Sequence, residues 1–263
     1  MKDANMSQML LPDGIIKEIR SFIQSQPEHI VRKQSKKSYQ QFLNTTSKKD
    51  IILTRDVGRE LGHPKNTSVA FLAWTEKSVD ENQTTLVGPD LSEHSETHMA
   101  FGKVLLLSVS DFDAENTYER YQELDLLRFK LNIHGYMMRA ASQQMREWSR
   151  ISQKALELGF SLFDLGSAWI DLYGRLPYVK GVEVIILTDP KAIKELDPIA
   201  QHVFKYVRAM MKMYEETNLD CSSCEYQDVC NEVQSLSAMR KKIIVSSSSR
   251  NPGSKNLDCP AHQ

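Results

Sequence analysis

The sequence predicts an α/β or α+β fold: a mixed sheet with packed helices, followed by a small C-terminal appendage that carries cysteines. Apolar runs of strand length alternate along the chain with segments of helical periodicity. Three of the 4 cysteines fall between positions 221 and 230, behind the last apolar strand. We expect four regions: an N-terminal helix and basic arm (1–45), a sheet domain (46–216), a cysteine segment (217–245) and a tail (246–263).

The composition is that of an ordinary globular protein, with 41% hydrophobic and 25% charged residues. The formal net charge of −1 gives no electrostatic reason to expect a nucleic-acid partner. No apolar run approaches the roughly 18–20 residues that span a bilayer, and the first residues lack the apolar core of a signal peptide. We therefore expect a cytoplasmic protein that binds neither nucleic acid nor membrane.

The N-terminal half is expected to hold one helix and three strands. Apolar residues at helical spacing over 14–26 predict an amphipathic helix, and the basic stretch 31–41 after it is expected to be a solvated arm. Apolar segments bounded by Gly, Pro, Asn or Asp predict strands over 68–75, 84–88 and 102–110.

A long helix is expected next, because helical periodicity runs from about Glu115 to Leu158 and stops at Gly159, a residue typical of helix C-termini. The nearly continuous apolar run 182–188 then predicts a strand that is covered on both faces. Two Asp-Pro pairs follow, each placing an N-cap carboxylate before a proline. They predict helices that start at about 190 and at about 198, the second running to about Glu216.

The cysteines form a metal-ligating pattern. Cys221, Cys224 and Cys230 have the spacing Cys-x2-Cys-x5-Cys, and thiolates grouped in this way favour zinc or an iron–sulfur cluster. Cys259 lies beyond a polar linker (246–256) and can return to complete the set at a modest loop-closure cost. The fourth ligand is Cys259, a group other than cysteine or a ligand from a partner protein, or none if one iron stays exposed. We expect a [4Fe–4S] cluster, with structural zinc and unliganded or redox thiols as the alternatives.

Four segments of the chain also carry a family resemblance. They are GRELGHPKNTSVAFLAWTEKS (58–78), LVGPDL (86–91), WSRISQKALELGF (148–160) and VKGVEVIILTDPKAIKE (179–195). In this order they resemble the middle domain of the acetyl-CoA synthase (β) subunit of carbon monoxide dehydrogenase/acetyl-CoA synthase. The resemblance covers roughly 58–210. It implies a role in the anaerobic acetyl-CoA synthase system, with a protein partner from the carbon monoxide dehydrogenase or corrinoid system.

The sequence departs from that family at both ends of the resemblance. In the family a large domain comes before the middle domain, whereas only some 50 residues stand there in this sequence. The family's catalytic domain follows, with a nickel and iron–sulfur A-cluster whose second nickel is bound by a Cys-Gly-Cys segment. This sequence contains no Cys-x-Cys. By resemblance the activity is that of a CO-methylating acetyl-CoA synthase, but we expect that this chain alone is not a complete synthase.

The predicted long helix would place three arginines, Arg139, Arg146 and Arg150, opposite an apolar stripe that includes Trp148. Guanidinium groups bind phosphates well, and the family's middle domain is thought to contribute to coenzyme A binding. Trp148 and Arg150 match the family pattern, while Arg139 replaces an aromatic residue associated with the coenzyme. The arginines and Trp148 are therefore candidate coenzyme A ligands, and a solvated helix face is the alternative interpretation.

The histidines are not expected to bind a metal. His94 and His98 have the i, i+4 spacing of a helical ligand pair, but they lie in a polar stretch after a Gly-Pro and lack the glutamate of a zincin motif. His134 and His202 are expected to be packed or surface residues. No glycine-rich phosphate loop, serine elbow or paired catalytic carboxylate is present in the sequence.

Two functional classes follow from these patterns. In the first, the chain is a member or accessory of the acetyl-CoA synthase system. In the second, it is a stand-alone [4Fe–4S] binding or electron-transfer module that docks to another anaerobic enzyme. Nickel content separates them, because a strict synthase requires nickel and the module needs only iron and sulfide.

Overall fold

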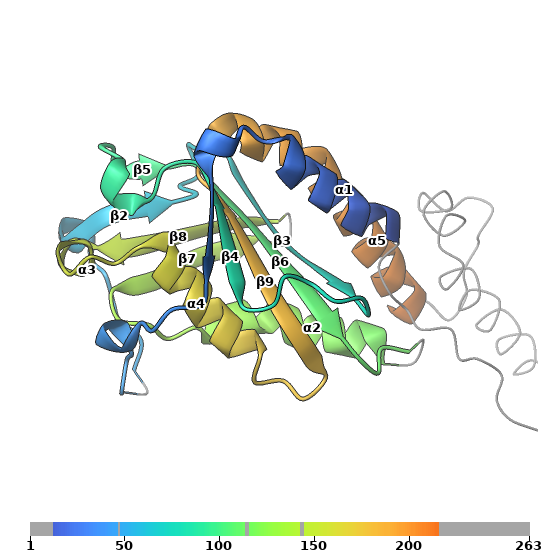
Figure 1. The fold of residues 1–263 in the computed structure, drawn as a ribbon. Coiled ribbons are helices and arrows are strands. Elements are labelled where there is room, and N and C mark those ends of the chain that lie inside the picture. Colours follow the sequence, from blue (N-terminus) through green and yellow to red (C-terminus); the bar gives the residue numbers. More distant parts are fainter. Residues whose placement is uncertain (1–12, 47, 114–115, 143–144, 216–263) are drawn as a thin grey trace, which may run out of the picture. The chain divides into compact units, whose positions relative to one another are not determined.

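The computed structural model describes residues 13–46, 48–113, 116–142 and 145–215 (Figure 1). The chain divides into two compact units, Met1–Lys205 and Tyr206–Gln263. The predicted cysteine segment and tail lie outside the described residues. Among those that are described, no helix has the combination of length and apolarity needed to cross a membrane.

A mixed five-stranded sheet forms the core of the first unit, in the order β1-β4-β9-β6-β3. Neighbours β4–β9 and β6–β3 run parallel, whereas β1–β4 and β9–β6 run antiparallel. Strands β3, β6 and β9 are buried almost throughout, and for β9 the apolar run 182–188 predicted cover on both faces. The strands are β1 (Val31–Ser35), β3 (Ser68–Thr75), β4 (Gln83–Val87), β6 (Phe101–Val109) and β9 (Val179–Leu187).

Helices cover both faces of this sheet. On one face lie α1 (Asp13–Ser25) and the first part of α5 (Pro190–Glu215), which are joined by a hydrogen bond from Gln26 to Glu195 (Figure 1). On the other face α4 (Leu162–Tyr173) packs against β4 and β9. The architecture is therefore α/β, as the sequence predicted.

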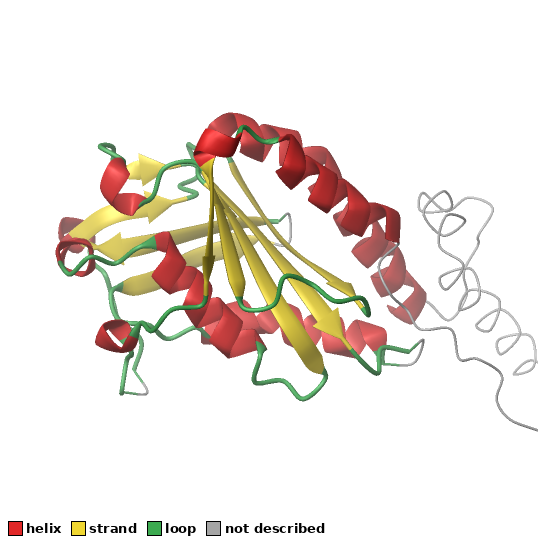
Figure 2. Cartoon of the chain, viewed as in Figure 1, coloured by secondary structure: helices red, strands yellow, loops and turns green. Residues whose placement is uncertain are grey.

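A second sheet of four strands lies beside the first, in the order β5-β2-β8-β7 (Figure 2). Strands β2 and β5 run parallel, and the other neighbours run antiparallel. The side-chain hydroxyl of Ser68 in β3 donates to the carbonyl of Glu147 in β8, at 3.0 Å, which ties this sheet to the core. Its strands are β2 (Val57–Leu61), β5 (His98–Met99), β7 (Tyr136–Ser142) and β8 (Arg146–Ser152).

Short elements complete the first unit. Two further helices are α2 (Thr117–Leu127) and α3 (Gln153–Glu157). The 3-10 turns are η1 (Glu28–Ile30), η2 (Gln40–Phe42), η3 (Thr54–Asp56), η4 (Leu91–Glu93) and η5 (Arg128–Lys130).

The prediction of one long helix from Glu115 to Leu158 was wrong. That region holds α2, the hairpin of β7 and β8, and the short α3. Burial along β8 shows why, since exposed Arg146 alternates with buried Glu147 and Ser149 at the period of a strand. Gly159 does follow a helix end, with a φ of 82° after the last turn of α3.

Two smaller expectations were also wrong. The predicted solvated arm contains β1, an edge strand whose charged residues Arg32 and Lys33 suit a partly solvated sheet edge. Asp189 does begin a helix, because its carboxylate accepts from the Ala192 amide at 2.8 Å. That helix then continues without a second start, with Pro198 inside it.

Candidate functional site

The predicted coenzyme A ligands gather on the outer face of the second sheet. Arg146, Trp148 and Arg150 alternate along β8, so their side chains point to the same face. Arg139 lies on the neighbouring β7, where the register shifts between Met138 and Ala140. We call this surface, made of Arg139, Arg146, Trp148 and Arg150, the Trp148 face.

Two guanidinium groups lie over the indole ring of Trp148. The guanidinium carbon of Arg139 is 5.1 Å from the ring centroid, and that of Arg150 is 5.8 Å from it. Both distances fall within the roughly 6 Å over which a cation is attracted to an aromatic face. The indole N–H is buried and has no hydrogen-bond partner among the residues that the structure describes. The face therefore combines positive charge, an aromatic ring and one unused donor.

Arg150 is committed to the protein itself. Its side chain is buried, its Nε lies 2.7 Å from the Glu60 carboxylate, and its Nη1 donates to the Ile52 carbonyl at 3.1 Å. Arg146 is exposed and donates to the backbone carbonyl of Asn66 at 2.9 Å, while Arg139 is exposed on β7. Of the three predicted arginines, Arg139 and Arg146 are thus the two that present their charge to solvent.

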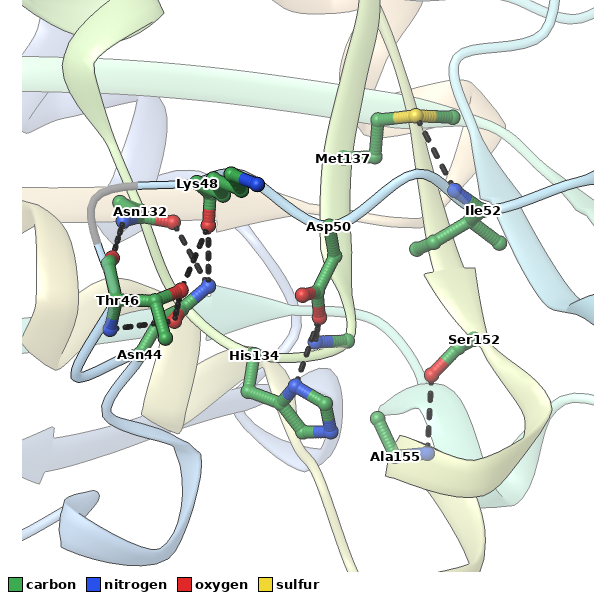
Figure 3. Close-up of polar contacts among 11 residues, drawn as sticks. Asn44, Thr46, Lys48, Asp50, Ile52, Asn132, His134, Met137, Ser152 and Ala155 are labelled. Atoms are coloured by element: carbon green, nitrogen blue, oxygen red, sulfur yellow. Dashed lines mark hydrogen bonds and ion pairs between the residues drawn. The ribbon is translucent and has the colours of Figure 1, made fainter.

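Residues 50–52, which include the Ile52 partner of Arg150, are bonded to the start of β7 (Figure 3). An Asp50 carboxylate oxygen lies 2.8 Å from Nδ1 of the His134 ring and accepts a hydrogen bond from the Gly135 amide at 2.6 Å. The Ile52 amide donates to the sulfur of Met137 at 3.4 Å. These contacts fix Ile52 so that its carbonyl meets Arg150. His134 is therefore a surface residue, 43% exposed, that contacts Asp50; the sequence predicted a packed or surface residue.

A second cluster adjoins the Trp148 face. The Nε2 atoms of His98 and His63 lie 3.2 Å and 3.7 Å from the same Glu60 oxygen, Oε2. The two imidazoles stack with centroids 4.3 Å apart, and His63 meets the edge of Trp148 at 5.3 Å. The three side chains can hold a metal ion, because their donor atoms all lie within 4.8 Å of one another.

An ion pair is buried between the two sheets. Lys103 of β6 contacts both carboxylate oxygens of Glu147, at 2.5 and 2.6 Å, and each side chain is only 2% exposed. Burial lowers the pKa of Lys103, and the Glu147 carboxylate acts in the opposite direction. The Lys103 ammonium also lies 4.4 Å from the ring centroid of Trp169 in α4. This pair joins the layers and does not reach the Trp148 face.

The remaining predicted site residues have different outcomes. Cys221, Cys224, Cys230 and Cys259 lie outside the described residues, so their metal or cluster stays a prediction. His94 and His98 do not share a helix, because His94 follows a 3-10 turn and His98 begins β5. His202 lies on α5, with Nδ1 3.9 Å from a Glu18 carboxylate oxygen.

Sequence reasoning missed Glu60 and His63. The run VGREL, at residues 57–61, does not alternate apolar and polar residues, because Arg59 and Glu60 are adjacent, so no local pattern marked Glu60. Its pairing with His98 depends on a parallel contact between segments almost forty positions apart, which no local spacing reveals.

Comparison with known proteins gives a consistent result for this domain. The family described as the CO dehydrogenase/acetyl-CoA synthase complex beta subunit matches residues 46–193, which is more than half of the chain. The matched range includes all residues of the Trp148 face and the neighbouring Glu60, His63 and His98.

Several curated relatives are named as beta subunits of the acetyl-CoA decarbonylase/synthase complex. The chain is 26% identical over 178 residues to the acetyl-CoA decarbonylase/synthase complex subunit beta of Archaeoglobus fulgidus, covering 65% of this chain and 33% of that protein. It is 26% identical over 176 residues to subunit beta 1 of Methanocaldococcus jannaschii, covering 65% and 23% of the two chains. The chain thus spans a third or less of these two relatives. It belongs to the CO dehydrogenase/acetyl-CoA synthase complex beta subunit family.

Proposed function

We propose that this chain is a coenzyme A-binding component of an acetyl-CoA decarbonylase/synthase system, in which it acts beside a complete synthase. The single observation that carries the proposal is the Trp148 face, where the exposed Arg139 lies over the indole and the exposed Arg146 lies on the same face of β8 as Trp148. The family supports it as well, because its relatives are named as beta subunits of the acetyl-CoA decarbonylase/synthase complex.

The chemistry of the face matches the nucleotide end of coenzyme A. A purine stacks on an aromatic ring, and exposed arginines form charge-assisted hydrogen bonds to phosphate oxygens. Arg139 and Arg146 supply those charges in the proposed complex. Arg150 acts as a positioning residue. Its bonds to Glu60 and Ile52 fix its guanidinium group, which lies over the Trp148 indole and so helps to hold the ring in place.

Calorimetric titration of coenzyme A into the parent chain and an Arg139→Ala/Arg146→Ala variant tests the proposal. Loss of even one charge-assisted phosphate contact is expected to weaken binding by about 1.5–3 kcal/mol, roughly ten- to a hundredfold. The matched control is Arg175→Ala/Lys180→Ala, which removes two exposed charges beyond α4 and at the start of β9. Equal affinities for all three proteins, or no binding to the parent, would overturn the proposal.

Truncated ligands locate the contact on the coenzyme. Dephospho-coenzyme A should bind the parent more weakly than coenzyme A, because it lacks the 3′-phosphate. Pantetheine, which has neither nucleotide nor phosphate, should show no measurable binding. Binding of pantetheine as tight as that of coenzyme A would place recognition away from the arginines.

We also propose that the cysteine segment holds an iron–sulfur cluster through Cys221, Cys224 and Cys230, with Cys259 as a fourth ligand. The Cys-x2-Cys-x5-Cys spacing supports this part of the proposal. A [4Fe–4S] cluster supplies one-electron transfer. The missing Cys-x-Cys favours a second candidate function, an electron-transfer module without nickel, and metal analysis of anaerobically purified protein distinguishes the two.

A further inference from the structure

We propose that Glu60, His63 and His98 form a binding site for one divalent transition-metal ion, of the zinc, cobalt, nickel or iron(II) class. The site lies at the β5–β2 side of the Trp148 face. The proposal is independent of coenzyme A binding, because it uses none of the exposed arginines.

Strand pairing brings the three ligands together. Glu60 in β2 and His98 in β5 are direct partners in the parallel register, so their side chains lie side by side. The chain then turns at Gly62, which has a φ of 66°, and this turn returns His63 to the same carboxylate. A Cβ atom at Gly62 would lie 2.1 Å from the Glu147 carbonyl oxygen, so a larger residue would disturb the turn.

The two distances from the imidazoles to Glu60 are close to those of ligands that share one ion. Two donor atoms bound to one zinc-like ion lie about 3.0–3.5 Å apart, given bonds of about 2.0–2.2 Å. The distance of 3.2 Å from His98 Nε2 to Glu60 Oε2 falls inside that range, and the corresponding 3.7 Å for His63 lies just above it. The His63 distance is too long for a hydrogen bond. A hydrogen bond to Glu60 therefore accounts for His98, while stacking on His98 keeps His63 beside it. The two ring planes are 16° apart, so the rings must tilt for both Nε2 lone pairs to meet one ion.

The surroundings orient the ligands. Arg150 holds Oε1 of Glu60 at 2.7 Å, which leaves Oε2 facing the two imidazoles. Such contacts to the outer atoms of ligands fix their orientation and raise affinity at metal sites. His63 is also packed against the edge of Trp148, with the ring planes at 83°. Two of the three ligands are thus held by neighbours before any ion binds.

Two imidazoles and one carboxylate form the donor set of open, reactive metal sites. Glu60 is 6% exposed, whereas the His63 and His98 side chains are 18% and 47% exposed. The remaining coordination positions therefore face solvent and would take water or a small anionic ligand. This exposure distinguishes the site from a closed structural zinc site.

Metal binding requires a change in the His63 ring. Its Nδ1 accepts a hydrogen bond from the Lys65 amide at 3.2 Å, so the proton of the neutral ring is on Nε2. A metal at Nε2 requires the proton on Nδ1 instead, and the Lys65 contact must break. This exchange of tautomers gives a spectroscopic signature at His63. His98 must change in the same way, because its Nε2 also faces Glu60, at 3.2 Å, and carries the proton of that hydrogen bond.

Co²⁺ titration of the full-length chain, made without an affinity tag, tests the site. All four cysteines are changed to serine in this background, so that thiolates cannot compete for the ion. We expect one equivalent of Co²⁺ with visible d–d absorption, and an affinity at least tenfold lower after either His63→Ala or His98→Ala. His29→Ala, at an exposed histidine outside the cluster, should leave the affinity unchanged.

Two outcomes would overturn the inference. Absence of Co²⁺ binding in the cysteine-free chain is one, and unchanged affinity in the His63 and His98 variants is the other. The His94→Ala variant separates this site from the His94–His98 pair in the sequence, because loss with His94 but not His63 would assign the ion to that pair. Nitrogen-15 NMR of the cysteine-free chain with Zn²⁺ gives a readout that needs no histidine variant. The tautomer of His63 must change when the ion binds.

Discussion

At the residue scale, Arg150 was predicted from the sequence to bind a ligand phosphate, but in the structure it pairs with a carboxylate of the protein. Guanidinium groups suit phosphates, and the sequence offered three of them close together. In the structure Arg150 is buried and bonded to Glu60, so its charge is compensated within the protein. The partner, Glu60, lies in β2, which is far from Arg150 in the sequence. Residue type and local spacing therefore could not predict this pairing.

Lys103 and Glu147 allow a direct measurement of a buried charge pair. Lys103→Met leaves the Glu147 carboxylate without its closest cation in a site that is 2% exposed, so unfolding in urea should show a loss of about 3–5 kcal/mol. The double variant Lys103→Met/Glu147→Leu should lose less than Lys103→Met alone, because it removes both charges.

The matched control is the surface pair of Lys77 and Asp13, also at 2.5 Å but with side chains 65% and 59% exposed. Lys77→Met should change stability by no more than about 1 kcal/mol, because solvent screens an exposed pair. Similar losses for Lys103→Met and Lys77→Met would show that burial of the inner pair has no energetic consequence.

At the element scale, the sequence predicted the central sheet well and the site poorly. The apolar runs of β3, β4, β6 and β9 are bounded by turn residues and buried on both faces, so local pattern alone identified them. The β7–β8 hairpin has polar residues on one face and bulges between Met138 and Ala140. Its mixed pattern also fits a helix. The helix prediction placed Trp148 on the face opposite the arginines, whereas in the structure Trp148 contacts Arg139 and Arg150.

The contact between α4 and β4 provides a prediction for one element. A Cβ atom at Gly166 would lie 2.3 Å from the Thr84 hydroxyl, so Gly166→Ala should destabilise the fold by about 1–3 kcal/mol in thermal or urea unfolding. Adding Thr84→Ala should recover part of the loss. That hydroxyl is buried and has no hydrogen-bond partner among the described residues, so its removal breaks no such bond in that part of the chain.

Gly14→Ala is the control for this substitution. Gly14 lies in α1, and nothing lies within 4 Å of the position that a Cβ atom would take there. Alanine at this position should therefore keep or slightly raise stability through its helix propensity. If Gly166→Ala behaved like Gly14→Ala, close packing of α4 on β4 would not be the reason for the glycine.

At the scale of the whole molecule, the two sites proposed in the sheet domain and the proposed cluster lie in different parts of the chain. The Trp148 face and the Glu60 cluster lie within residues 46–193, where the family matches. The four cysteines all come after that range. Cluster loading and the fold of the sheet domain should therefore respond separately to substitution.

The last prediction tests whether the cysteine segment holds an iron–sulfur cluster, and whether losing it leaves the sheet domain unchanged. Protein purified without oxygen should be brown and contain iron and sulfide, and Cys224→Ser should abolish the colour and the iron because it removes a central thiolate. Ser223→Ala, a change of one atom at the adjacent position, should keep both. Melting curves and coenzyme A affinity should stay the same in all three proteins. Full iron content in the Cys224→Ser variant would refute the cluster assignment, and acetyl-CoA synthesis by the isolated, nickel-supplied chain would show that it is a complete synthase after all.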